Sequence, residues 1–409
     1  MAKVDRQKGV RTSTKPPAPA GPHRDQPARK KGLGTFLRED HPYVLLGTSV
    51  LALCGIWLSM RPRSAMSFLA PYYGLEVALY WVLVAWVAVS VLALLTKILY
   101  KDDYRARSPF ASEKAKPIER YLSYVVWAIV VVFFLDRAVM GFANTVSVAI
   151  SSNSKPQGDD LAAVIFIVYE CSGIFEAGIL TTIELAVFGT VIAFFLALLL
   201  VFVRIQVPDR QDNDFVRFLK IVGSGFAKVY STVVRGTPMM VQGLVIFFGV
   251  FSMLRDSGLS TQQANAIWST FVAGLVVISL NSTAYMMEVL RGGIEAVDPG
   301  QLEAARSLGL SQWQAMRKVV IPQGVKNSIP ALSNELVINI KDSSVLSVIG
   351  VFDLMFASNT AAGIYYTQTP VYAFAAVVYL ILTYVASKLL NLLSKRLGAG
   401  SVDTTPSSN

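Results

Sequence analysis

Three polar side chains near the end of one apolar segment have the types and the spacing needed to bind a small charged molecule. Glu335, Asn339 and Asp342 stand four and three residues apart, so a helix places them on one face. Ionisable residues inside apolar segments are costly and usually face a bundle interior or an aqueous cavity. The stripe could therefore bind an ammonium group, although a polar network that only joins helices would use the same residues. Further polar residues could line the same cavity, namely Ser343, Ser344, Gln242 and Asn281.

Residue types suited to catalysis or metal binding are scarce. The two histidines, His23 and His41, both lie near the N-terminus, and Cys54 and Cys171 lie in or beside apolar runs. This set predicts neither a disulfide framework nor a metal site. The sequence contains no Gly-x-x-x-x-Gly-Lys-Ser/Thr loop to hold the phosphates of ATP. We therefore expect no catalytic residue, no metal and no cofactor bound by this chain.

The composition indicates that most of the chain lies in lipid. Hydrophobic residues make up 53% of the chain and charged residues 16%, whereas a soluble domain carries about 25% charged residues. Because a membrane helix needs about 20 apolar residues, repeated runs of that length predict an all-α, polytopic membrane protein of about eight transmembrane helices. The expected spans cover residues 43–60, 75–99, 121–150, 174–203, 226–254, 266–290, 329–351 and 370–393.

The charges of the loops predict how these spans are oriented. The loops at 97–120, 204–220 and 291–326 are basic, whereas the alternate loops carry few or no basic residues. Basic loops stay in the cytoplasm, so both termini are predicted to be cytoplasmic. The net charge is +10, and much of it lies in a Pro-rich segment before residue 40, which we interpret as a disordered tail. No aromatic residue interleaves with its basic residues before Phe36, so no nucleic-acid binding is expected.

The spans fall into two groups. The polar stretch 151–160 separates the first three spans from the last five. The predicted divisions are a disordered basic cytoplasmic tail at 1–40, a three-helix extension at 41–150, a five-helix core at 170–395 and a second cytoplasmic tail at 396–409.

The cytoplasmic loop of the core, residues 292–325, carries the signals of a short helix. Asp298 can cap it and Pro299 can occupy its first position, and a capping box is expected between Asp298 and Gln301. Gly309 can take the left-handed conformation that ends the helix. The first prediction for this loop is therefore a helix over residues 299–308.

A second helix is expected directly after the first one. Ser311 with Gln314 predicts a second capping box, and Pro322 is expected to help stop the helix. The first helix should expose small residues beside Glu303, as a helix that enters a groove on another protein would. An amphipathic loop that packs on its own membrane domain is the alternative.

The same loop resembles the EAA loop of ABC importer permeases. The sequence Glu-Ala-Ala is followed by a Gly six residues after the Glu and by a Pro thirteen residues after the Gly. The family usually ends this motif with Ile-x-Leu-Pro, whereas this chain has Val-Val-Ile-Pro. The resemblance implies a coupling helix that docks into a cleft of a separate ATPase, which would hold the ATP and Mg²⁺. The residues so implicated are Glu303, Ala304, Ala305, Gly309, Leu310 and Pro322.

Three further motifs resemble those of polar amino acid permeases. They are VRGTPMMVQ at 234–242, AYMMEVLRGGI at 284–294, and SNE at 333–335 with KDSS at 341–344. The resemblance implies a type I permease core in the last five spans and a substrate contact at Glu335. The three additional N-terminal spans resemble the M-type permease of the general L-amino-acid importer.

The resemblance also implies a function and partners. The chain would be the permease subunit of an ATP-driven amino acid importer in the bacterial inner membrane, and would form half of the translocation pathway. Its implied partners are an ABC ATPase dimer, a second related permease subunit, a periplasmic amino-acid-binding protein, an L-amino acid substrate and membrane lipid. The alternative is a secondary amino acid transporter driven by an ion gradient, but no internal repeat of the kind common in such proteins is visible.

Overall fold

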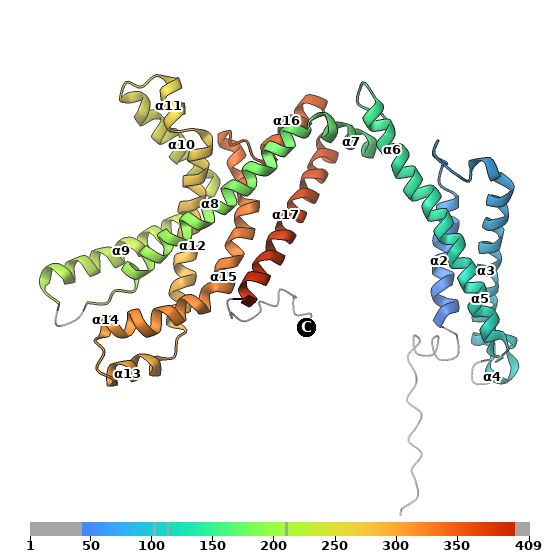
Figure 1. Ribbon diagram of the computed structural model, residues 1–409, viewed down its shortest axis with the longest axis horizontal. Coiled ribbons are helices and arrows are strands. Elements are labelled where there is room, and N and C mark those ends of the chain that lie inside the picture. The colour runs from blue at the N-terminus through green and yellow to red at the C-terminus, as the bar shows by residue number, and fades with distance from the viewer. Residues whose placement is uncertain (1–42, 101–103, 113, 209–211, 397–409) are drawn as a thin grey trace, which may run out of the picture. The chain divides into compact units, whose positions relative to one another are not determined.

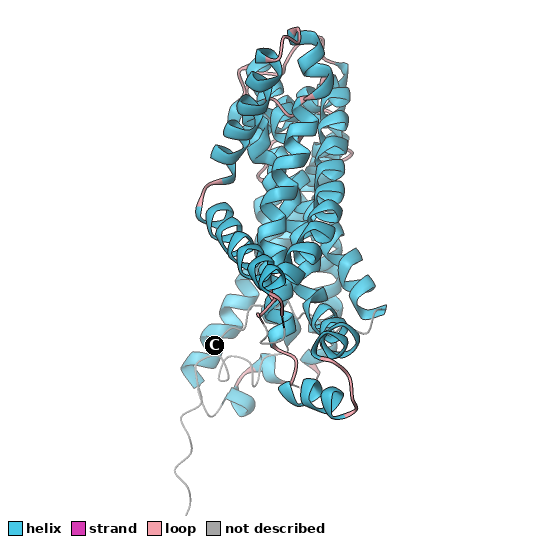
Figure 2. Cartoon of the chain, turned by 90° about the vertical axis from the view of Figure 1, so that its left-hand side faces the viewer, coloured by secondary structure: helices cyan, strands magenta, loops and turns pink. Residues whose placement is uncertain are grey.

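The computed structural model describes residues 43–100, 104–112, 114–208 and 212–396 of this chain. Every regular element within these ranges is a helix (Figures 1 and 2), which confirms the predicted all-α class. Contacts divide the chain into two compact units, Met1–Asn144 and Thr145–Asn409. The predicted tail at 1–40, both histidines and all but the first residue of the tail at 396–409 lie outside the described residues.

Long apolar helices form the first unit. α2, α3 and α5 pack against one another around buried residues that include Leu83, Trp86 and Phe133. Gly55 permits a close approach, because a Cβ atom there would lie 2.7 Å from Cδ1 of Leu83. The elements are α2 (Tyr43–Ser59), η1 (Ala70–Tyr72), α3 (Tyr73–Tyr100), α4 (Tyr104–Arg107), η3 (Pro109–Ala111), α5 (Ala115–Phe133) and η4 (Phe134–Val139), after which α6 (Met140–Ser151) leads into the second unit.

A buried group of charged side chains connects the loop after α2 to the helix that contains η4. Asp136 and Arg137 lie in the π-helical turn η4 and are both buried. Arg137 forms ion pairs with Asp136 and with Glu76, and Arg63 pairs with Glu76 at 2.8 Å. The hydroxyl of Ser67 donates to Asp136 at 2.9 Å. A buried charge is costly unless it is paired in this way, so these contacts hold this end of the unit together.

The second unit is arranged around α12, which packs against α8, α9, α10 and α15. α12 is the most buried of the candidate spans. The elements are α7 (Asp160–Glu170), α8 (Ser172–Arg204), α9 (Asp214–Gly236), α10 (Met239–Asp256), α11 (Thr261–Ile267), α12 (Thr270–Glu295), α13 (Pro299–Ser307), α14 (Gln312–Ala315), η5 (Met316–Val320), α15 (Ile321–Asp342), η6 (Ser343–Ile349), α16 (Leu354–Tyr365) and α17 (Gln368–Arg396).

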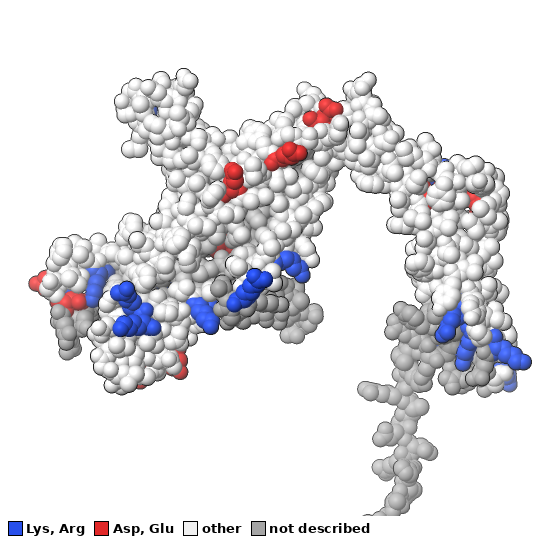
Figure 3. Space-filling view, in the orientation of Figure 1, with Lys and Arg blue, Asp and Glu red and all other residues white. Residues whose placement is uncertain are grey.

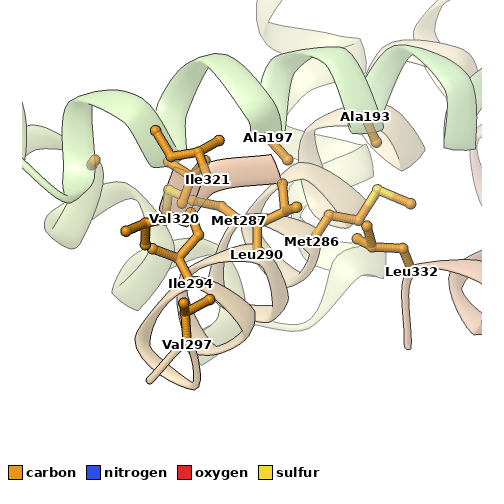
Figure 4. Packing of buried hydrophobic residues seen from close by; sticks show 12 residues of the cluster. Ala193, Ala197, Met286, Met287, Leu290, Ile294, Val297, Val320, Ile321 and Leu332 are labelled. Carbon is orange, nitrogen blue, oxygen red and sulfur yellow. The ribbon is translucent and has the colours of Figure 1, made fainter. Parts of the chain in front are cut away.

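α12 and α15 approach closely because each carries a glycine at their contact. A Cβ atom at Gly293 would lie 2.0 Å from Oγ of Ser328, and one at Gly324 would lie 2.6 Å from the Cα atom of Ile294. Small residues let membrane helices come together at such short range. Apolar side chains of α8, α12, η5 and α15 pack beside this contact (Figure 4): Ala193, Ala197, Met286, Met287, Leu290, Ile294, Val320, Ile321 and Leu332.

The predicted number of eight spans is approximate. Among the described residues, six helices are long and apolar enough to cross a membrane, and one bent pair would make seven. The expected span at 226–254 differs most, because the helix breaks into α9 and α10. Thr237 is extended, with φ −123° and ψ 146°, since a residue before proline avoids the α-helical conformation. Only α10 of this pair is long and apolar enough to span.

Pro322 does not stop the second helix of the loop at 292–325, contrary to the prediction. α14 continues through the π-helical turn η5 into α15, and the N–H of Ile321 donates to the carbonyl of Met316. Pro322 stands in the first turn of α15. A proline needs no N–H partner, and the widened turn provides a place for its ring. The loop therefore joins the next span without a break in the helix.

Candidate functional site

Asn339, in the middle of the predicted polar stripe, is held by the two helices that face α15. Its Oδ1 accepts a hydrogen bond from Oγ of Ser282 at 2.7 Å, and its Nδ2 donates to Oγ1 of Thr190 at 2.8 Å. Only 1% of the residue is exposed. These bonds join α15 to α12 and α8, which favours the structural alternative for this amide.

Gln242 and Asn281, which were both predicted to line a cavity, contact each other. Nδ2 of Asn281 donates to Oε1 of Gln242 at 3.2 Å. Nε2 of Gln242 donates to the carbonyls of Val234 at 2.8 Å and Thr237 at 3.0 Å. Carbonyls at the end of a helix need such partners, so Gln242 satisfies the backbone at the break between α9 and α10.

Ser343 and Ser344 open the 3₁₀ turn η6 at the end of α15. Their hydroxyls donate to the carbonyls of Ile340 at 2.9 Å and Lys341 at 2.6 Å. Ser343 is buried and Ser344 is half-buried. Both side chains thus bond to their own helix, and each oxygen retains capacity to accept a further hydrogen bond.

Glu335 and Asp342 are the two acids of the stripe, and they differ from their polar neighbours. Among the described residues, no hydrogen bond or ion pair reaches either carboxylate. Glu335 is 7% exposed and Asp342 is half-buried. They stand two turns apart on α15, so they share a face. A buried carboxylate without a partner is expensive, and a cation would be stabilised beside this pair.

Two surface grooves run beside α15. A groove of about 500 Å³ is apolar and lies between α8, α15 and α17, with Leu336 in its wall. A groove of about 390 Å³ is more polar, lies between α15 and α17, and has Asn334 in its wall. Glu335 lies between Asn334 and Leu336 in the sequence, but its side chain lines neither groove. The stripe is therefore not the floor of either hollow on this chain.

The first helix of the loop at 292–325 begins where the sequence predicts. α13 starts after Asp298, whose carboxylate accepts a hydrogen bond from the N–H of Gly300 at 2.8 Å. The expected capping box with Gln301 is not formed, because the carboxylate turns to this nearer N–H. The helix itself is confirmed, since its cap still satisfies one free backbone donor.

The turn and the second helix start also follow the sequence. Gly309 has φ +85°, the left-handed conformation that glycine adopts readily. Ser311 and Gln314 form the predicted capping box at the start of α14. Local signals of this kind depend on residues a few positions apart, and here they were sufficient.

The outer surface of α13 differs from the prediction. Ala305 does not face outward but is buried, because α13 folds against η5. The N–H of Leu310 donates to the carbonyl of Ala305 at 3.3 Å and closes the turn. Glu303, Ala304 and Leu308 are exposed, and Leu308 is 85% exposed. An apolar side chain so exposed at the tip of a turn is suited to enter a pocket on another protein.

Two partly buried polar contacts were not expected from the sequence. Asp353 caps α16 and accepts a hydrogen bond from the hydroxyl of Tyr379 at 3.3 Å. Glu288 of α12 accepts from Oγ of Ser231 at 3.0 Å and pairs with Arg291 at 2.7 Å. The available signal was an acid inside or beside an apolar run. Within the described residues, no group of three or more His, Cys, Asp or Glu is placed to hold a metal ion.

Comparisons with known proteins identify a family model and several similar proteins. A family model described as "Binding-protein-dependent transport system inner membrane component" matches residues 223–399. The octopine transport system permease protein OccM of Rhizobium meliloti is 34% identical over 223 residues, which is 53% of this chain and 83% of that protein. The arginine transport system permease protein ArtQ of Bacillus subtilis is 31% identical over 220 residues, 54% of this chain and 90% of that protein. A solved structure described as "Crystal structure of an amino acid ABC transporter with histidines" is 34% identical, with a TM-score of 0.47, and the match covers 56% of this chain and 96% of that one.

Proposed function

Because this chain belongs to the inner-membrane components of binding-protein-dependent transport systems, we propose that it carries amino acids, and that Glu335 contacts their ammonium group. The chain is a permease subunit and not an enzyme. Relatives named as an arginine permease and an octopine permease support an amino acid cargo. Because all amino acids share the ammonium group, this contact would not select among the side chains of the substrate.

The observation that carries the proposal is the unpaired carboxylate of Glu335. Its burial, together with the absence of a hydrogen bond or ion pair from the described residues, marks it as a place for a cation. Asp342 adds a second negative charge on the same face, and the hydroxyls of Ser343 and Ser344 can accept hydrogen bonds. Asn339, Gln242 and Asn281 would line the site while holding the helices around it.

The stripe is proposed to face a second permease subunit. A site that neither groove of this chain encloses needs another wall. A related chain would provide it and complete the pathway as a heterodimer. A periplasmic amino-acid-binding protein would deliver the substrate, and both termini of this chain would be cytoplasmic. The three-helix extension at 41–150 and the core at 170–395 would both lie in the inner membrane.

Transport is proposed to be driven through the loop at 292–325. An ATPase dimer that holds ATP and Mg²⁺ would bind the surface that carries Glu303, Ala304 and Leu308. Ala305, Gly309 and Leu310 would shape that surface, and Pro322 would lie where the loop joins α15. Because α14, η5 and α15 are continuous, a displacement of the loop reaches the stripe directly. ATP would then select one of two orientations of the core.

The test of the site is Glu335→Gln in the assembled importer. The substitution keeps the shape of the side chain and removes its charge. A hydrogen bond between charged partners contributes about 1.5–3 kcal/mol to binding. Uptake of a labelled amino acid below saturation should fall at least about tenfold. Co-purification of the ATPase and the second permease should be unchanged.

A matched control is Glu176→Gln, which removes an exposed carboxylate at the start of α8. This control should transport at the wild-type rate. Wild-type uptake by the Glu335→Gln variant would contradict the proposed contact. Loss of co-purification would instead indicate that Glu335 serves assembly.

A further inference from the structure

α9 presents an apolar surface that no described residue of its own unit covers. Seven residues at helical spacing lie on one side of it, and each is between 50% and 68% exposed. They are Phe215, Phe218, Leu219, Val222, Phe226, Val229 and Val233. We call this side the apolar flank of α9. A contiguous apolar face of this length marks a surface that meets a membrane or another protein.

A different side of α9 fixes it to the rest of the unit. The hydroxyl of Tyr230 donates to the carbonyl of Leu280 at 2.6 Å, and Oγ of Ser231 donates to Glu288 at 3.0 Å. Oγ of Ser224 donates to the carbonyl of Arg204 at 3.1 Å. These bonds reach α12 and the end of α8. The apolar flank therefore has a fixed direction and cannot rotate into the core.

The third side of α9 is basic. Arg217, Lys228 and Arg235 lie on one stripe and are exposed. Arg235 lies over the ring of Tyr285, 5.4 Å from its centre. Within the described residues, no acid pairs with Arg217 or Lys228. In Figure 3 the Lys and Arg side chains of this unit lie mostly along its lower part, at the level of α9 and below, and the upper side of α9 is white.

An apolar side next to a basic side is the pattern of a helix that lies in the plane of a membrane surface. α9 has 23 residues but fails the requirements for a span, whereas α10 after the break at Thr237 meets them. The chain thus turns at Thr237 from a surface direction into the bilayer. A second protein would cover the apolar flank equally well, but it would leave the basic stripe without a partner.

We propose that α9 lies in the inner leaflet, with its apolar flank among the acyl chains and with Arg217 and Lys228 bound to the phosphates of anionic phospholipids. The assignment to the inner leaflet rests on the proposed function, which places both termini in the cytoplasm. The contact of α9 with lipid rests only on the apolar and basic sides of the helix. Because Tyr230 and Ser231 bond α9 to α12, α9 would move together with α12 in any conformational change of α12.

The direct test measures what surrounds the apolar flank. Spin labels at Val222→Cys and Val229→Cys, in a Cys54→Ala background that removes the exposed native thiol, are placed in the full importer in bilayers. The expected result is high accessibility to oxygen and low accessibility to a water-soluble nickel chelate. Gln262→Cys in α11 and Leu380→Cys in α17 provide the aqueous and lipid references, since both are exposed.

Two other outcomes overturn the proposal. Low accessibility to both reagents means that another protein covers the flank, and high accessibility to the nickel chelate means that it faces water. Neither readout depends on substrate, so a failure here is separate from a failure of the Glu335 contact.

The headgroup contact has its own variant, Arg217→Gln with Lys228→Gln. Retention of phosphatidylglycerol by the purified importer is measured against phosphatidylcholine. Each basic residue near a membrane surface changes affinity for anionic lipid by roughly fivefold, so the pair should weaken it by about 25- to 30-fold. The control Arg255→Gln removes an exposed charge in the last turn of α10 and should change nothing. Unchanged retention in the double variant would refute the phosphate contact.

Discussion

Replacement of Leu308 by alanine should weaken binding of the ATPase by a predictable amount. The side chain is 85% exposed at the tip of the turn after α13. Leu308→Ala removes three carbon groups, each of which contributes about 0.8 kcal/mol when buried. If docking buries the exposed portion, the loss is about 2 kcal/mol, or roughly 30-fold in the dissociation constant. Leu308 has an ordinary φ of −79°, so alanine should not disturb the turn.

The measurement is the affinity of the purified permease complex for its isolated ATPase, with ATP absent and present. Leu380→Ala is the matched control, because Leu380 is 68% exposed in α17 and far along the chain from the loop. The control should bind as the wild type does. An affinity for Leu308→Ala within about twofold of the wild type would show that this side chain does not enter a pocket. The docking surface would then have to be sought on Glu303 and Ala304 alone.

Two further substitutions test the packing of each unit. Gly293→Ala should destabilise the detergent-solubilised protein by roughly 1–3 kcal/mol, because the added Cβ would lie 2.0 Å from Oγ of Ser328. Gly292→Ala is the control, because a Cβ there would have nothing within 4 Å. This control should be neutral or stabilising in a thermal unfolding assay. Equal stability of the two would contradict the contact of α12 with α15. Arg137→Met should cost the first unit about 3–5 kcal/mol by leaving Asp136 and Glu76 buried without their shared cation. The exposed Arg61→Met should cost far less, so Arg137→Met should be cleaved faster than Arg61→Met in limited proteolysis.

Features set by neighbours in sequence could be predicted from the sequence. The helix after Asp298, the left-handed Gly309 and the capping box at Ser311 follow from local backbone chemistry. The membrane spans follow from the length of the apolar runs. The unpaired acids of the stripe, Glu335 and Asp342, were visible because a charge in an apolar run is rare.

Features set by distant neighbours could not be predicted. Asn339 is satisfied by Thr190, 149 residues away, and no spacing reveals such a pair. Ala305 is buried because α13 folds against η5, which depends on the angle of the turn and not on the residue type. The apolar flank of α9 continues the apolar run of α10, so the sequence alone suggested a single span. Pro322 acts as a stop only where a regular helix would need its N–H, and the π-helical turn removes that need.

The unbroken helix from α14 through η5 into α15 has a consequence for the length of this segment. Each residue of a helix advances the angular phase by about 100°, so the number of residues between the loop and Glu335 sets the direction in which the carboxylate points. Removal of one residue from α14 would swing the acid out of alignment with its site, whereas removal of one from η5 would be absorbed as the π-helical turn becomes a regular α-helical turn. Insertion of seven residues, close to two full turns, would nearly restore the phase but would raise the stripe by about 10 Å. Side chains along this rod can be exchanged far more freely than its length can change.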